Sequence, residues 1–204
     1  MKKILLGILI VVLGIAGYYW YMFSRSGGGN SGPKQEALKL KKHSEAFNQS
    51  VSAAMNAYFD MSAAFVDADT TKAKTAAAQF VKLLDTIPMA ELKKDTTNIY
   101  ETAMGTFDGI KSNAADILVQ TDLQEMRKDF SMVSENLYPF FKIINYEGEK
   151  MYWQNCPMAF GEEKEANWVS KTPEVVNPYL GKNHPEFKAT MLHCGMTKDT
   201  IKAQ

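Results

Sequence analysis

Apolar residues recur every three or four positions between residues 34 and about 145, and this spacing restricts the fold more than any other feature of the chain. Such a period places apolar side chains on one face of an α-helix. Four segments of this kind follow one another with short connections, which favours antiparallel neighbours. The sequence therefore predicts a mainly α-helical protein built on an antiparallel four-helix bundle. The expected core positions are Phe47, Val51, Ala54, Tyr58, Met61 and Phe65; Ala73, Ala77, Phe80, Leu84 and Ile87; Tyr100, Ala103, Phe107, Ile110, Ala114 and Ile117; and Leu123, Met126, Phe130, Val133, Leu137, Phe140 and Ile144.

Turn and cap residues divide these four segments. Pro88 is expected to end the second segment, because proline has no backbone N–H to continue a helix. Thr121 and Gln124 have the spacing of a capping box at the start of the fourth segment. Pro139 lies inside that segment and predicts a kink in its last turns.

The chain begins with an apolar run, from Ile4 to Phe23, that contains no charged residue. It is long enough as a helix to cross a bilayer core of roughly 30 Å. Lysines precede the run and aromatic residues end it, which is typical of a membrane anchor. We interpret residues 1–24 as a signal-anchor of the bacterial inner membrane, with a cleaved signal peptide as the alternative. The positive-inside rule then places the rest of the chain in the periplasm.

The remaining chain divides into three parts by composition. Residues 25–33 are rich in glycine and serine and are expected to form a flexible linker. Residues 34–145 form the predicted bundle. After residue 145 the helical period is lost, so residues 146–204 are expected to form an irregular cap that contains short strands near residues 151–153 and 166–170. The chain has 23 basic and 23 acidic residues, and this balance argues against nucleic-acid binding.

Both cysteines of the chain lie in this cap, each in a Cys-x-Met segment. Thiols and thioethers are soft ligands of the kind that Cu(I) selects, and an imidazole and a further thioether lie nearby in the sequence. In an extended segment, positions i and i+2 point to the same side, so each segment can offer two sulfur atoms. The sequence therefore predicts a Cu(I) or Ag(I) site. Its candidate ligands are Cys156, Met158, Met191, His193, Cys194 and Met196.

A disulfide between Cys156 and Cys194 is the alternative interpretation. Two cysteines in an oxidising compartment normally pair, and closing this loop would contribute roughly 4 kcal/mol of stability in the loop-closure model.

Zinc is disfavoured because no closely spaced cysteine pair is present. Of the other histidines, His43 is interpreted as solvated surface and His184 as part of a turn. No motif of a known catalytic class occurs, so the chain is predicted to be a binding protein rather than an enzyme.

The motifs of the cap resemble those of an uncharacterised bacterial domain family. They are, in order, Cys156-Pro157-Met158, Trp168 with Ser170, Asn177-Pro178-Tyr179 and Met191-Leu192-His193-Cys194-Gly195. Members of that family are small anchored or secreted helical proteins, or are fused to periplasmic adaptors of copper and silver efflux pumps. The segment from Asn183 to Lys188 is longer than the family pattern implies. We expect the cap to pack through Trp153, Trp168, Asn177, Pro178 and Tyr179.

Two functions follow from these observations. In the first, the anchored periplasmic domain binds Cu(I) or Ag(I) and passes the ion to a heavy-metal efflux adaptor or pump, a role that the resemblance implies. In the second, a disulfide staples the cap of a scaffold or protein-interaction module that binds no metal. A thiol redox protein is a third interpretation.

Overall fold

The computed structural model describes residues 13–22, 42–95 and 98–202. The chain divides into two units, Met1–Lys39 and Leu40–Gln204. In the first unit residues 13–22 are helical, whereas the rest of the predicted anchor and the predicted linker at 25–33 lie outside the described residues. No helix within the described ranges is long and apolar enough to cross a membrane. The anchor therefore stays a prediction.

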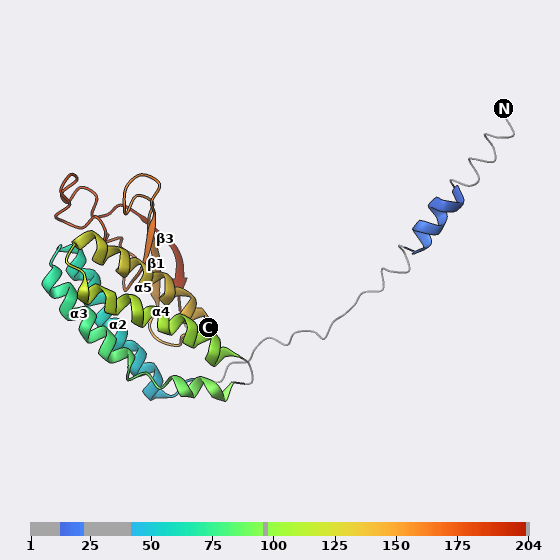
Figure 1. The fold of residues 1–204 in the computed structure, drawn as a ribbon, viewed down its shortest axis with the longest axis horizontal. Helices are drawn as coiled ribbons and strands as arrows, with labels where there is room; N and C mark the ends of the chain where they lie inside the picture. Colours follow the sequence, from blue (N-terminus) through green and yellow to red (C-terminus); the bar gives the residue numbers. More distant parts are fainter. Residues whose placement is uncertain (1–12, 23–41, 96–97, 203–204) are drawn as a thin grey trace, which may run out of the picture. The chain divides into compact units, whose positions relative to one another are not determined.

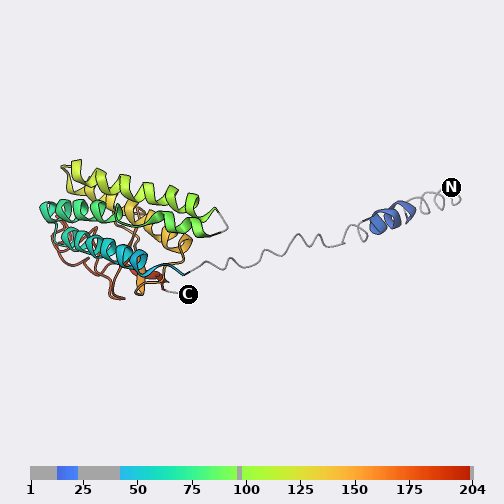
Figure 2. The ribbon, with the colours of Figure 1, turned by 90° about the horizontal axis from the view of Figure 1, so that it is seen from below.

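The second unit is mainly helical and ends in a small antiparallel sheet (Figure 1). Contacts between its long helices follow the chain order, and Figures 1 and 2 show these helices side by side. The mainly helical prediction is confirmed, while the short helix η1 was not predicted. The elements are α2 (Glu45–Val66), α3 (Thr70–Leu84), η1 (Met89–Lys94), α4 (Ile99–Val119), α5 (Leu123–Ile143), β1 (Met151–Cys156), β2 (Ala166–Ser170) and β3 (Met196–Ile201).

The predicted apolar faces form the core. All of their side chains are buried except those of Tyr100 and Leu123, which are partly buried. Phe130 lies at the centre, where its ring stacks on Tyr58 with centroids 5.0 Å apart and contacts Phe65 at 5.1 Å. Each large apolar side chain buried in this way contributes roughly 1.5–3 kcal/mol. Aromatic contacts therefore join α2 to α5 within the core.

Aspartates cap α3 and α5, and at α5 the cap is not the predicted threonine. Asp69 accepts a hydrogen bond from the Lys72 amide at the start of α3. At the start of α5, Asp122 accepts from the amides of Gln124 and Glu125. The predicted capping box at Thr121 is wrong because the helix begins one residue later, where the carboxylate of Asp122 reaches the free N–H groups.

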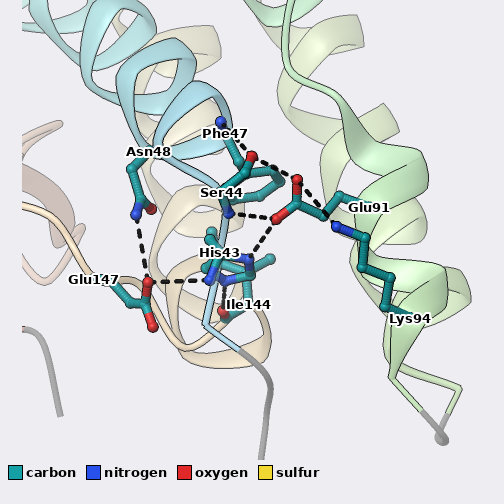
Figure 3. Close-up of polar contacts among 8 residues, drawn as sticks. All are labelled: His43, Ser44, Phe47, Asn48, Glu91, Lys94, Ile144 and Glu147. Atoms are coloured by element: carbon teal, nitrogen blue, oxygen red, sulfur yellow. Dashed lines mark hydrogen bonds and ion pairs between the residues drawn. The ribbon is translucent and has the colours of Figure 1, made fainter.

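The start of α2 is held by a partly buried polar cluster (Figure 3). Ser44 caps the helix, and its amide and hydroxyl both donate to the Glu91 carboxylate at 2.6 Å. The imidazole of His43 stacks on Phe47, and its Nε2 donates to the carbonyl of Ile144 at 2.5 Å. Only 5% of the His43 side chain is exposed, so the interpretation as solvated surface is wrong. The lysines that precede His43 in the sequence suggested an exposed position, but distant segments of the fold cover its side chain.

Glu91 remains ionised within this cluster. Burial disfavours the carboxylate charge, but hydrogen bonds from Ser44 and the nearby charges of Lys94 and His43 outweigh it, so the pKa of Glu91 lies below its ordinary value. The charge of Glu91 is therefore used to fix the first turn of α2 onto η1.

The C-terminal sheet has the order β2-β1-β3, and both pairings are antiparallel. Cys156 pairs with Ala166 on one side of β1, and Met151 pairs with Ile201 on the other. The predicted strands near residues 151 and 166 are confirmed as β1 and β2. Strand β3 was not predicted because polar residues fill its interior and no apolar alternation marks it.

A hydrogen-bond relay connects the free edge of β2 with the helices. The Val169 amide donates to the Tyr58 hydroxyl at 3.1 Å, and this hydroxyl lies 2.7 Å from the hydroxyl of Ser134. Ser134 in turn donates to the carbonyl of Phe130 at 2.9 Å. Because a carbonyl can only accept, the direction of the whole relay is fixed. The relay satisfies a strand edge that would otherwise be buried without a partner.

We predict that Tyr58→Phe lowers the free energy of unfolding by about 1–3 kcal/mol, since it leaves the buried Val169 amide without an acceptor. Urea unfolding followed by circular dichroism measures this loss. Tyr100→Phe is the matched control, because its ring remains beneath the Lys93 ammonium and only a partly exposed hydroxyl is removed. Equal stability of the two variants would contradict the role of the relay.

Strand β3 is tied to α5 through Asp199. Its carboxylate accepts hydrogen bonds from the Tyr138 hydroxyl at 2.5 Å and from the Lys142 ammonium at 3.0 Å. The Thr200 amide donates to the other carboxylate oxygen at 2.7 Å. These three donors lower the pKa of Asp199 from 3.8 to about 2. Because the folded pKa lies below the unfolded one, this stabilisation is present above about pH 4 and is lost as the pH falls through 2.

We expect Asp199→Asn to lower the free energy of unfolding at pH 7 by on the order of 1 kcal/mol, a modest value because solvent screens this partly exposed carboxylate. The difference between wild type and variant should shrink as the pH falls below 4. Urea unfolding at a series of pH values measures both effects. Asp60→Asn, which removes an exposed carboxylate on α2, is the control and should show neither.

Candidate functional site

The two cysteines meet in the cap. Their sulfur atoms lie 3.6 Å apart, although the residues are 38 positions apart in the sequence. Cys156 ends β1 and is buried, whereas Cys194 lies just before β3 and is partly exposed. Both are free thiols. The prediction that their two segments are neighbours is confirmed, and the dithiol pair is the candidate site.

Asn177 fixes the position of Cys194. Its amide nitrogen donates to the Cys194 carbonyl at 2.8 Å, and its amide oxygen accepts from the backbone N–H groups of Tyr179 and Leu180. The side chain is completely buried, so it links two segments of the cap without competition from water. The Asn-Pro-Tyr motif is therefore a structural clip beside the thiols.

Gly195 allows the chain to pass between Cys194 and β3. Its φ is +139°, and a Cβ atom there would lie 2.4 Å from the carbonyl oxygen of Asn155 and 3.2 Å from the ring of Trp168. A side chain would therefore be strained by its backbone conformation and would also clash. The glycine brings the Cys194 segment directly against β1.

The residues expected to pack the cap do so. Trp168 is 1% exposed and meets the ring of Tyr179 edge-on at 5.9 Å. Trp153 stacks on Tyr138 of α5 at 4.6 Å, and the carbonyl of Pro178 accepts a hydrogen bond from α5 at 3.0 Å. Trp153 thus joins the sheet to α5, and Trp168 joins it to the segment that carries Tyr179.

Burial changes the acidity of the first thiol. Desolvation, the largest effect, and the neighbouring Cys194 together raise the pKa of Cys156 from 9.0 to about 11. Hydrogen bonds from the Met158 amide and the Asn177 side chain oppose this shift without reversing it. Cys156 is therefore a protonated thiol at neutral pH, and either oxidation or metal binding must remove its proton.

The structure directs Met196 away from the two thiols and places Met158 in the lining of a cavity. Met196 pairs with Asn155, so its side chain projects from the face of the sheet opposite to Cys156, and it is 57% exposed. Met158 lies in a turn and contributes to a separate cavity. Across residues 13–22, 42–95 and 98–202, no three His, Cys, Asp or Glu side chains converge as a metal site.

His193 and Met191 precede Cys194 in the sequence and differ in their surroundings. The imidazole of His193 is exposed, and its Nδ1 donates to the Val175 carbonyl at 2.7 Å. Met191 is partly buried against the core, and its backbone carbonyl accepts from the Cys194 amide at 3.0 Å. The extended geometry assumed for the two Cys-x-Met segments does not hold, because a turn follows Cys156 and the left-handed Gly195 lies between Cys194 and Met196.

Sequence reasoning missed Arg127, which supports the site from α5. This arginine is 1% exposed and donates to the carbonyls of Pro178 at 3.0 Å and Phe65 at 2.8 Å. Burial lowers its pKa to about 10, so it remains charged at neutral pH. A cation three positions before Phe130, on the apolar face of the helix, was the signal that could have indicated a buried role.

These features define a helical domain that carries a sheet with a partly buried dithiol pair. Residues 54–148 match the model of a family described as "Protein of unknown function (DUF3347)", which confirms the predicted resemblance to a domain family of unknown function. The match runs from α2 to the loop before β1, so the helices carry it, whereas the motifs on which the resemblance rested lie beyond it. No significant match was found among curated proteins or solved structures.

We predict that Gly195→Ala destabilises the protein more than Gly161→Ala. Both glycines have positive φ, so each alanine should cost about 1–3 kcal/mol in backbone strain, but only position 195 adds a clash. Thermal unfolding and the rate at which a thiol reagent labels Cys194 measure the effect. Equal behaviour of the two variants would mean that the close approach to Asn155 is unimportant.

Proposed function

We propose that this protein is a non-enzymatic binding module of the bacterial envelope whose cap is closed by a disulfide between Cys156 and Cys194. The approach of the two sulfur atoms to 3.6 Å carries this proposal. Residues 1–24 would anchor the module in the inner membrane and place it in the periplasm, where disulfides persist. The helices would form an antiparallel four-helix platform for the cap.

Three observations support a disulfide over a metal site. A disulfide bond of about 2.05 Å needs only a small further approach of the sulfur atoms. The candidate thioether of Met196 projects from the other face of the sheet. The burial of Cys156 hinders direct exchange of a ligand at its sulfur, whereas a permanent bond does not require such access.

A soft-metal site is the second candidate, and the same sulfur separation favours it. With metal–sulfur bonds of about 2.3 Å, one ion can bridge two thiolates at this distance. Cu(I) or Ag(I) would be the preferred ions. His193 is suited to join them, because its Nδ1 donates to a backbone carbonyl and leaves Nε2 as a free acceptor. In this proposal an efflux adaptor or pump would receive the ion.

The disulfide is tested on protein isolated from the periplasm without reductant. We expect an intact mass lower by two hydrogens and no thiol labelling before reduction. Reduction should lower the free energy of unfolding by about 2–4 kcal/mol. The double variant Cys156→Ala/Cys194→Ala should show no response to reductant. Free thiols in wild-type protein from that compartment would contradict the proposal.

The metal site is tested separately on the reduced protein without oxygen. Titration with Cu(I) against a chromogenic competitor should show one ion retained by wild type, a large loss of affinity in Cys194→Ser, and no change in Met196→Leu. Absence of binding by the reduced wild type would remove the metal candidate and leave the disulfide unaffected. Weaker binding by Met196→Leu would contradict the placement of that side chain.

A further inference from the structure

A second potential binding site lies between the first turns of α5 and the loops of the cap. It is a cavity of about 550 Å³, within the size range of small-molecule pockets. The large apolar side chains that line it are those of Met158, Phe160, Leu180 and Phe187. Met158 thus belongs to this cavity, and the segment from Asn183 to Lys188, which departs from the family pattern, supplies one of its walls.

This wall is preformed. The Nδ1 atom of His184 accepts the amides of Glu186 and Phe187 at 3.3 and 3.2 Å. Its ring stacks on Phe187 with centroids 4.8 Å apart, and its carbonyl accepts from the Lys188 amide at 2.9 Å. Because Nδ1 is an acceptor, the proton of the neutral ring lies on Nε2, which leaves neither nitrogen free as a metal ligand. The cavity therefore offers an aromatic wall rather than a metal site.

The charges at the rim are unbalanced. Glu162 and Glu186 line the cavity, and neither carboxylate forms an ion pair with any residue that the structure describes. The single lysine of the rim, Lys128, is held by Glu125 at 2.6 Å. The site thus combines two unpaired negative charges with phenylalanine rings, whose faces attract cations.

We propose that this cavity binds an organic cation that carries an apolar body, such as an alkyl- or aryl-ammonium compound. The apolar part would lie against Met158 and Leu180, and the cationic head would face the phenylalanine rings and the carboxylates of Glu162 and Glu186. Binding here uses neither thiol, so it is independent of the state of Cys156 and Cys194.

Benzyltrimethylammonium is the probe, and amide chemical shifts of the full domain in NMR spectra are the measurement. We expect saturable shifts centred on residues 158–162 and 184–187. Neopentylbenzene, which has the same shape without the charge, should bind more weakly, and benzoate should not compete. Equal binding of the charged and neutral compounds, stronger binding of benzoate, or shifts spread over other surfaces would overturn the proposal.

Glu162→Gln and Glu186→Gln test the carboxylates without changing side-chain size. Each should raise the dissociation constant of the cation about two- to five-fold, the range expected for a solvent-exposed charge pair. Glu163→Gln is the matched control, because it removes the same charge one residue away from a carboxylate that lines the cavity and should leave the affinity unchanged. An equal rise of the dissociation constant in all three variants would indicate only a general electrostatic attraction and would overturn the proposed site.

Discussion

The hydrogen-bond relay from Val169 through Tyr58 and Ser134 is the interaction on which the rest of the domain depends. It lies in the buried space between α2, α5 and β2, where an unpaired backbone amide is costly. Burial raises the pKa of Tyr58 far above its ordinary value, so the hydroxyl keeps its proton and its role as a donor. Nearby, the hydroxyl of Tyr179 donates to the Asn167 carbonyl, so two tyrosines cover the edge of β2.

The attachment of the β2 edge to the helices also positions the two thiols of the cap. With β2 fixed on the helices, β1 is held in register and ends at Cys156. The returning chain is attached to the end of α2, where the Lys182 amide donates to the Val66 carbonyl at 2.8 Å. Gly181 makes this approach possible, because at its φ of +61° a Cβ atom would lie 2.6 Å from the same carbonyl. Asn177 then holds Cys194 in place by donating a hydrogen bond to its carbonyl.

The sequence predicted the features that depend on local periodicity and missed those that depend on tertiary contacts. The four apolar faces identified the helices because the 3.6-residue period is strong. The meeting of Cys156 and Cys194 followed from the expectation that cysteines pair in an oxidising compartment. The opposite direction of Met196 was not predictable, since it follows from one left-handed glycine and the register of a polar strand. His43 and Arg127 look like surface residues until distant segments cover them.

The unequal exposure of the two thiols sets the order of any chemistry at the pair. Cys156 is buried and its pKa is about 11, so it is a poor nucleophile and cannot meet an external reagent first. Cys194 is partly exposed and its carbonyl is held by Asn177, so an oxidant or a soft ion reaches its sulfur first. Cys156 then reacts within the domain, 3.6 Å away, and loses its proton in that second step. The helices position the pair, but access to Cys194 determines how fast it reacts.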